Sequence, residues 1–234
     1  MFIANVEAIS GPPVRLIELR IDTPGFHFLA GQYLEIVHPS GEAIPMTIAS
    51  SPMRLPRLCL HYRFIPGAPG AELLDELFST QDKLSIRGPF GDVYVSAGDA
   101  PEVPLLLIAG GTGASQALAI IDDLEQRQCS TRVDLLACSD QPEDLYFRAE
   151  LTAKEPSWLH PTYIIDARRS AHNKAQLWLR DHASRFTEHR IVLSGSPGFV
   201  YTTLATLQTA GIARSQTSSD VYAYAPQPVD PAPS

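Results

Sequence analysis

The sequence has little of what secreted, membrane-spanning or metal-binding proteins need. Its 234 residues include three cysteines, and no apolar run approaches the roughly 18 residues that cross a bilayer. Cys59, Cys129 and Cys138 are widely spaced and form no C-x-x-C pair, which favours a reducing compartment. The first residues contain neither a basic segment nor a long apolar segment, so no signal peptide is expected. We therefore expect a cytoplasmic protein without a membrane span.

Positive charge is also scarce. The chain has 18 Lys and Arg against 26 Asp and Glu, a formal net charge of -8. An acidic chain suits neither nucleic acid nor an anionic membrane, whereas it suits a basic protein partner. The seven histidines show no metal-ligand spacing, and the cysteine spacing of plant-type iron–sulfur clusters is absent. No metal site is predicted.

The pattern of what is present changes at about residue 98. Before it, Ile17, Leu19 and Ile21 alternate with polar residues, and similar short segments are separated by turns rich in Gly and Pro. This pattern predicts six or seven antiparallel strands in a closed barrel or a sandwich. The predicted strands are 3–9, 17–22, 32–38, 45–50, 58–64, 83–87 and 92–95, with a short helix at about 70–79.

After residue 103, apolar strands alternate with amphipathic helices, which is typical of a doubly wound parallel sheet. Ser196 and Pro197 suit the start of the last long helix, and Gly211 suits its end. The predicted strands are 104–109, 132–138, 161–165, 190–194 and 221–225, and the helices 114–127, 143–153, 173–185 and 197–210. The chain thus divides into three parts: a β domain at 1–98, an α/β domain at 99–225 and a loose, proline-rich tail at 226–234.

A glycine cluster joins the first strand of the α/β part to its helix. The apolar segment 105–109 runs into Gly110-Gly111-Thr112-Gly113, and a helix with one apolar face follows. This order directs backbone N–H groups and the positive helix end at one point, which suits a phosphate or pyrophosphate. The spacing is neither G-x-G-x-x-G nor a P-loop. A tight turn without a ligand is the alternative explanation.

Seven short motifs follow one another along the chain. They are A-G-Q-Y at 30–33, I-P-M-T-I-A-S-S-P at 44–52, I-R-G-P-F-G at 86–91, G-G-T-G at 110–113, D-L-Y at 144–146, S-G-S-P at 194–197 and D-V-Y-A-Y at 220–224. In this order they resemble the ferredoxin–NADP reductase superfamily over about residues 3–225. The resemblance is closest to stand-alone NAD(P)H:flavin reductases and to the reductase components of bacterial aromatic oxygenases.

The resemblance implies a fold and a reaction. The fold is an N-terminal antiparallel Greek-key β-barrel of the flavin-binding type, followed by a C-terminal Rossmann-like α/β domain with a parallel sheet. The cofactors are FAD or FMN and a nicotinamide coenzyme, and hydride passes from nicotinamide C4 to flavin N5. The flavin supplies the chemistry, while the protein stacks on it, hydrogen-bonds to it and excludes water. A ferredoxin or an oxygenase component is the possible protein partner.

The resemblance places the flavin on three segments: Pro45, Met46 and Thr47; His61, Tyr62 and Arg63; and Gly70 and Ala71. It assigns the Thr47 hydroxyl to flavin N5, which a hydroxyl can serve as donor or acceptor. Pro45 and Met46 would flank the ring, and Gly70 and Ala71 would offer N–H groups to a phosphate. An ordinary strand, solvated-face or turn role is the alternative for these residues.

Ile44 departs from the family pattern, which has an arginine that pairs with the flavin phosphate. Isoleucine cannot make this contact, worth about 1.5–3 kcal/mol. Three explanations remain. The flavin is a diffusible substrate, or another arginine (Arg54, Arg57 or Arg63) takes over the phosphate, or the protein has lost flavin.

The resemblance also places the nicotinamide coenzyme. The pyrophosphate is assigned to Gly110, Gly111, Thr112 and Gly113, and the nicotinamide pocket to Ser194, Gly195 and Pro197. One tyrosine of the last strand, Tyr222 in preference to Tyr224, is expected near the flavin ring, with core packing as the alternative. Ser194 stands where many relatives have cysteine, so it offers a hydroxyl but no thiol. Asp140 is assigned to the adenosine ribose, where a carboxylate accepts a hydroxyl and repels a 2′-phosphate. NADH is therefore expected rather than NADPH, although Arg148 is the nearest residue that could reverse this.

The leading hypothesis is an NAD(P)H-dependent flavin reductase in which Thr47 and Ser194 are the catalytic residues. One alternative is a reductase that holds FAD tightly and passes electrons to a ferredoxin or oxygenase partner. Another is a non-catalytic regulatory subunit, because Ile44, Met46 and Ser194 all depart from the reductase pattern.

Overall fold

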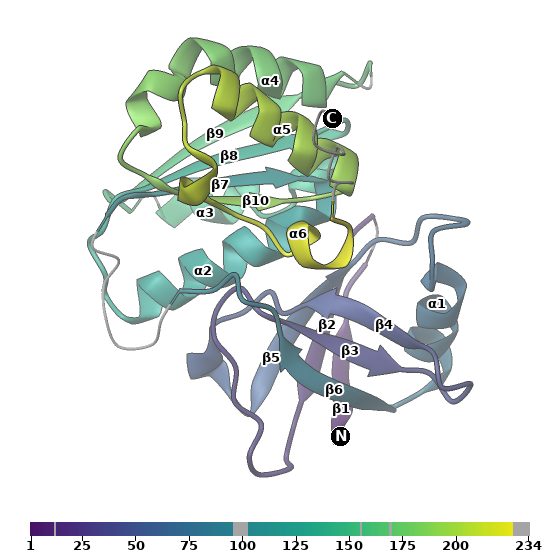
Figure 1. Ribbon diagram of the computed structural model, residues 1–234. Helices are drawn as coiled ribbons and strands as arrows, with labels where there is room; N and C mark the ends of the chain where they lie inside the picture. The colour runs from purple at the N-terminus through teal and green to yellow at the C-terminus, as the bar shows by residue number, and fades with distance from the viewer. Residues whose placement is uncertain (12, 96–102, 155, 169, 227–234) are drawn as a thin grey trace, which may run out of the picture.

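Two sheets make up the molecule in the computed structural model, which describes residues 1–11, 13–95, 103–154, 156–168 and 170–226 (Figure 1). One is an antiparallel sheet of six strands and the other a parallel sheet of five. The predicted fold class, an antiparallel barrel followed by a Rossmann-like α/β domain, is confirmed. The predicted boundary at 98–99 and residues 227–234 of the predicted tail lie outside the described residues.

The antiparallel sheet has the strand order β4-β3-β6-β1-β2-β5. Its strands are β1 (Phe2–Ile9), β2 (Arg15–Arg20), β3 (Tyr33–Val37), β4 (Ala43–Thr47), β5 (Arg57–Tyr62) and β6 (Lys83–Phe90). A bridge between Ile48 and Leu60 links the end of β4 to β5 and closes the sheet into a barrel. Buried Leu34 and Ile36 alternate with partly exposed neighbours along β3, as a strand with one core face requires. Helix α1 (Ala71–Thr80) packs Leu74, Leu77 and Phe78 into this core.

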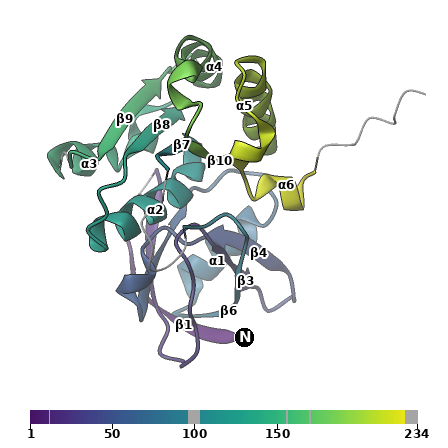
Figure 2. The same cartoon turned by 60° about the vertical axis from the view of Figure 1, so that its left-hand side comes forward.

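The parallel sheet has the order β11-β10-β7-β8-β9. Its strands are β7 (Leu105–Gly110), β8 (Val133–Ser139), β9 (Leu159–Ile165), β10 (Arg190–Ser194) and β11 (Thr217–Ser218). Helices α2 (Ala114–Gln126) and α3 (Arg148–Lys154) lie on one face, and α4 (Ala171–His182) and α5 (Pro197–Thr209) lie on the other (Figure 2). Because β7 is covered on both faces, all six of its residues are buried.

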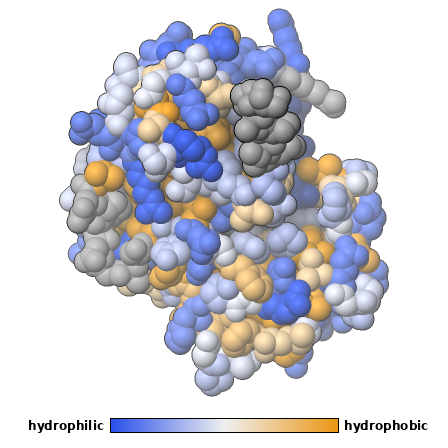
Figure 3. All heavy atoms as spheres, viewed as in Figure 1, coloured by the Kyte–Doolittle hydropathy of each residue, from blue (hydrophilic) through white to orange (hydrophobic). Residues whose placement is uncertain are grey.

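The surface is mixed in character. On the face drawn in Figure 3, hydrophilic residues are interspersed with small hydrophobic groups, several of them over the barrel. Within the described residues no helix combines the length and apolar character needed to cross a bilayer.

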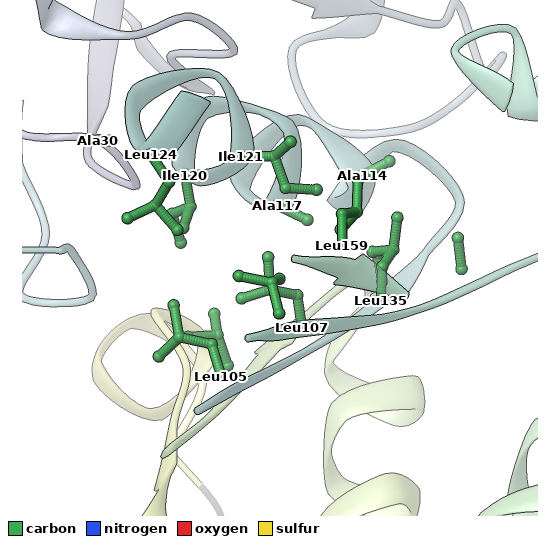
Figure 4. Packing of buried hydrophobic residues seen from close by; sticks show 14 of the residues in the cluster. Ala30, Leu105, Leu107, Ala114, Ala117, Ile120, Ile121, Leu124, Leu135 and Leu159 are labelled. Atoms are coloured by element: carbon green, nitrogen blue, oxygen red, sulfur yellow. The ribbon is translucent and has the colours of Figure 1, made fainter. Parts of the chain in front are cut away.

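Two separate clusters hold the parallel sheet between its helices. Leu105 and Leu107 of β7 meet Ile120 and Leu124 of α2, as the side chains in Figure 4 show. Leu106 and the other alternate residues of β7 face the α4 and α5 side. Alternate residues of β7 therefore pack against helices on opposite faces of the sheet.

Two predicted strands are wrong. Residues 92–95 form no strand, because the chain leaves β6 at Gly91, and Val93 and Val95 bury themselves in the α2 cluster. Residues 221–225 are helical instead. The two-residue β11 ends at Ser218, the Ser219 hydroxyl accepts the N–H of Val221, and the short helix α6 (Val221–Tyr224) begins there. In Figure 1, α6 lies between the parallel sheet and the barrel.

Helix boundaries follow the predicted end signals more closely. The Ser196 hydroxyl accepts the N–H of Phe199 at 3.4 Å, Pro197 begins α5, and Gly211 after its end has a φ of 89°. The predicted helix 143–153 is interrupted: a 3-10 turn, Pro142–Leu145, precedes α3.

Candidate functional site

The glycine cluster lies at the carboxyl edge of the parallel sheet, where β7 and β10 run side by side. The chain leaves β7 for β8 on one side, while β10 lies on the other, so this is the switch point where doubly wound sheets bind ligands. A Cβ on Gly113 would lie 2.5 Å from the Ser194 carbonyl oxygen, which makes this glycine a packing requirement. A Cβ on Gly111, whose φ is +56°, would meet nothing within 4 Å. Gly111 thus leaves its backbone open to a ligand.

A cavity of about 280 Å³ adjoins Gly111 and contains the predicted Asp140. It is lined by Arg63, Gly111, Ser139, Asp140, Gln141, Asp144 and His172. The buried carboxylate of Asp144 accepts the Ser139 hydroxyl at 2.8 Å and forms an ion pair with Arg63. Arg63 therefore reaches from the barrel to the carboxyl edge of the parallel sheet.

A second cavity, of about 330 Å³, lies outside the barrel and is lined by Tyr33, Glu35, Pro45, Thr47, Asp220 and Tyr224. We call it the ring pocket. Pro45 and Thr47 alternate with buried neighbours along β4, so both face outward into it. The Thr47 hydroxyl makes no hydrogen bond within the described part of the chain. Two tyrosines and a proline offer flat apolar walls, and one free hydroxyl is available to a ring heteroatom.

Several residues predicted to contact the flavin do not line the ring pocket. Met46, 9% exposed, packs in the barrel core and does not line the ring pocket. Tyr62 is buried and donates its hydroxyl to the Ala71 carbonyl at 2.8 Å, which fixes the start of α1. His61 hydrogen-bonds to Tyr146 of the α/β domain, and burial lowers its pKa to about 4.

An apolar side chain packs against the phosphate cradle that the resemblance implies at Gly70 and Ala71, and the Ala71 N–H already donates to the Ala68 carbonyl at 3.0 Å. Ile44, 6% exposed, packs so tightly on Gly70 that a Cβ there would lie 2.8 Å from its side chain. The carboxylate of Glu72, in the first turn of α1, accepts the Gly67 N–H at 3.0 Å. The three arginines considered as substitutes are paired elsewhere: Arg54 with Asp122, Arg57 with Glu7 and Arg63 with Asp144. The residues that line the ring pocket therefore fit a flavin ring, and each of these three arginines is already paired with a carboxylate.

No family model matches the chain, whereas individual proteins do. Reductase component 2 of terephthalate 1,2-dioxygenase from Comamonas sp is 29% identical over 226 residues, 93% of this chain and 66% of that protein. The NAD(P)H-flavin reductase of Vibrio harveyi is 34% identical over 129 residues, 53% of this chain and 54% of that protein. The chain is a homologue of these reductases.

Solved structures show the same fold. The ferredoxin reductase of carbazole 1,9a-dioxygenase matches with a TM-score of 0.76 at 23% identity, over 94% of this chain and 68% of that one. The ferredoxin-NADP+ reductase from Plasmodium falciparum matches with a TM-score of 0.79 at 13% identity, over 94% and 96%. This chain has the two-domain fold of the ferredoxin–NADP reductases.

In this reductase homologue, Ser194 is buried at the end of β10, and its hydroxyl donates to Oε1 of Gln116 at 2.5 Å. The hydroxyl therefore belongs to a network inside the protein. Thr112 is exposed at the open loop, and Gly195, with a φ of 151°, packs against Phe199.

Of the two C-terminal tyrosines, Tyr224 and not Tyr222 lines the ring pocket. Tyr222 stacks under Arg214, whose guanidinium carbon is 3.6 Å from the ring centre, and its hydroxyl meets Thr217. Tyr224, 63% exposed, lines the ring pocket instead. The change follows from α6, because a helix turns successive side chains by about 100° where a strand alternates them.

Sequence reasoning missed Asp220, the residue that precedes α6. Its carboxyl lines the ring pocket beside Thr47, and burial raises its pKa to about 6. Asp220 opens the D-V-Y-A-Y motif, so the motif itself contains the signal for this residue.

Proposed function

We propose that the chain is an NADH-dependent flavin reductase that takes flavin as a diffusible substrate. Hydride, carrying two electrons, passes from nicotinamide C4 to flavin N5, giving NAD+ and reduced flavin. The observation that carries the proposal is the pair of Ile44 and Gly70: the ring pocket is open, whereas an aliphatic side chain packs against Gly70 where the family has an arginine for the phosphate. Homology to NAD(P)H-flavin reductases supports the same activity.

In this reaction the residues of the chain bind and orient the flavin and the coenzyme. Tyr33, Pro45 and Tyr224 provide surfaces on which a flavin ring can stack. The Thr47 hydroxyl accepts from or donates to N5 according to its redox state. Gly111 offers open backbone to the coenzyme pyrophosphate at the carboxyl edge of β7.

A preference for NADH is supported by the charges of the cavity beside Gly111, to which we assign the coenzyme and which we call the coenzyme cavity. Asp140 and Asp144 are both carboxylates, and the one arginine that lines the cavity, Arg63, is already paired with Asp144. A 2′-phosphate placed here would meet negative charge without a free cation. Arg148 stacks over the Tyr163 ring, 5.2 Å from its centre, and does not line this cavity.

Equilibrium binding of riboflavin, FMN and FAD, followed by flavin fluorescence, tests the proposal. If no side chain recognises the phosphate, riboflavin and FMN should bind within about threefold of each other, because their rings are identical. A preference of about tenfold or more for FMN or FAD would reveal a phosphate site and contradict the proposal.

The second candidate function is a reductase that delivers electrons to an oxygenase or a ferredoxin. It is favoured by the alignment of 93% of this chain with the terephthalate dioxygenase reductase component. A partner would meet an acidic protein, so its docking face should be basic. Yellow protein that keeps its flavin through dialysis would favour this function over the first.

A cytoplasmic location is part of the proposal. It is supported by the cysteines Cys59, Cys129 and Cys138, which are all free and buried.

A further inference from the structure

Gln116, in the first turn of α2, uses its whole amide group in hydrogen bonds. Its oxygen Oε1 accepts the Ser194 hydroxyl at 2.5 Å. Its nitrogen Nε2 donates to the Gly31 carbonyl at 2.7 Å and to Oδ2 of Asp220 at 2.8 Å. The side chain is 4% exposed, so water does not compete for these bonds. A flipped amide would set its oxygen against the Gly31 carbonyl and the Asp220 carboxyl, so a single orientation is favoured.

The three partners come from three separate parts of the chain. Gly31 precedes β3 of the barrel, Ser194 ends β10, and Asp220 precedes α6. Gln116 thus joins the barrel, the parallel sheet and the C-terminal helix at one buried point beside the ring pocket.

The two oxygens of the Asp220 carboxyl are not equivalent. Oδ2 receives the Gln116 N–H, whereas Oδ1 has no hydrogen bond among the described residues and lies 3.1 Å from the place of a Cβ on Gly91. Because an N–H occupies Oδ2, a proton taken up by this carboxyl sits on Oδ1.

We propose that Gln116 is a positioning residue that holds Asp220 with Oδ1 turned into the ring pocket. The assignment of that pocket to flavin rests on the proposed function, but the arrangement of Gln116 and Asp220 does not.

The surroundings of Asp220 make its protonation relevant near neutral pH. Burial raises its pKa to about 6, the Gln116 hydrogen bond works in the opposite direction, and Asp92 adds to the increase. The other ionisable groups at the pocket are Tyr33, whose pKa is raised, Tyr224, whose pKa is also raised, and Glu35, which is paired with Arg87. In oxidised flavin the carbonyl oxygens and the nitrogens N1 and N5 are acceptors, so they should bind more tightly beside a protonated Oδ1, which can donate to them, than beside an ionised one.

The direct test is a titration of the Asp220 carboxyl carbon by ¹³C NMR in ligand-free protein labelled at aspartate, with Asp220→Asn to assign the signal. The expected midpoint is near pH 6. Gln116→Met has a similar volume but no amide, so it should move the midpoint upward by about one pH unit. Gln176→Met is the matched control, because Gln176 is also buried but donates to Thr203 at 3.0 Å between α4 and α5. The control should keep the wild-type midpoint, and an unchanged midpoint in Gln116→Met would overturn the proposal.

If Gln116→Met does not fold, Ser194→Ala replaces it. This variant keeps both donors of Gln116 but removes the hydrogen bond that orients the amide, so a smaller upward shift is expected, and no shift overturns the proposal. Fluorescence titration with FMN at pH 5 and pH 7.5 then separates the two proposals. A shifted Asp220 midpoint without FMN binding refutes the flavin assignment alone, whereas FMN binding with an unshifted midpoint refutes the role of Gln116 alone.

Discussion

At the scale of single residues, the proposed mode of flavin binding rests on Ile44. Ile44→Arg would place a cation beside Gly70 at the N-terminus of α1, where the Ile44 side chain now packs. A charge-assisted hydrogen bond of about 1.5–3 kcal/mol should strengthen FMN binding by at least about tenfold. Riboflavin has no phosphate, so its affinity should not change. Fluorescence titration with both flavins measures the difference.

Ile44→Met serves as the control for this variant, because it keeps an apolar side chain of similar volume. Both variants should first be compared with the wild type in thermal unfolding, since Ile44 packs in the barrel core. If Ile44→Arg increased the affinity for riboflavin and for FMN equally, the arginine would act on the ring and not on the phosphate. The explanation of flavin binding from Ile44 and Gly70 would then fail.

Thr47 is the residue expected to touch the reacting nitrogen. Thr47→Ala should lower kcat for flavin reduction by roughly 10- to 100-fold and leave KM for NADH within about twofold, because the hydroxyl is lost at N5 and not at the coenzyme. Steady-state kinetics with NADH and FMN measures both constants, with Thr47→Ser as the variant that keeps a hydroxyl. An unchanged kcat in Thr47→Ala would remove Thr47 from the mechanism.

Some residues of the site could be read from the sequence and others could not. Pro45 and Thr47 follow from a local motif and the alternation of β4, and both line the ring pocket. Gln116 and the turn of Asp220 toward it depend on partners 104 positions apart, which no local pattern encodes. Met46 was expected beside the ring because of its motif position, but strand alternation directs it into the core.

At the scale of elements, the β7–α2 turn makes different demands on two glycines. Gly113→Ala should lower the free energy of unfolding by about 3 kcal/mol, because its Cβ would meet the Ser194 backbone at 2.5 Å. Gly111→Ala meets nothing, so its cost should be about 1 kcal/mol, from its positive φ. Urea unfolding measures both costs. If Gly111→Ala proved the more destabilising variant, the packing account of this turn would be wrong.

The link between β5 and the turn before α3 should depend on pH. The Tyr146 hydroxyl hydrogen-bonds to Nδ1 of His61, and burial lowers the pKa of this histidine to about 4, against about 6.5 in an unfolded chain. Between these values the unfolded chain binds a proton that the folded chain does not, so stability falls as pH falls from 6.5 to 4.

His61→Gln keeps an acceptor for Tyr146 but does not titrate, so it should lose about 1–2 kcal/mol less than wild type between pH 7 and pH 5. Urea unfolding at the two pH values measures this difference, with the exposed His160→Gln as the control. Parallel loss of stability in wild type and His61→Gln would show that His61 does not titrate in this window.

Elements with a strong period were predictable from the sequence, and short connections were not. The alternation of apolar and polar residues predicts strand β2, and the apolar face at helical spacing predicts helix α2, each from local sequence alone. Residues 92–95 alternate too, but Val93 and Val95 pack on α2 rather than in a sheet. The segment 221–225 has the aromatic composition of a strand, yet β11 ends at Ser218, the Ser219 hydroxyl accepts the Val221 N–H, and a short helix follows.

At the scale of the whole molecule, several buried or bidentate contacts join the barrel to the α/β domain. The Ser51 hydroxyl donates to Asp123 at 2.9 Å, and Arg54 holds Asp122 through two bonds of 2.7 Å. Gln116 and the pair of His61 and Tyr146 add further links. The ring pocket and the coenzyme cavity therefore sit on one connected body, with Gly111 and Thr47 contributed by different domains.

The central claim is that this body reduces flavin that it does not permanently hold. An anaerobic titration of the purified protein with NADH, followed at the flavin absorbance with and without added FMN, tests it most directly, with NADPH in a parallel titration. The account predicts no bleaching without added FMN, bleaching of added FMN by NADH, and slower bleaching by NADPH. Bleaching of a flavin already present in the protein would contradict the claim of a diffusible substrate, and no bleaching of added FMN by either coenzyme would contradict the proposed activity.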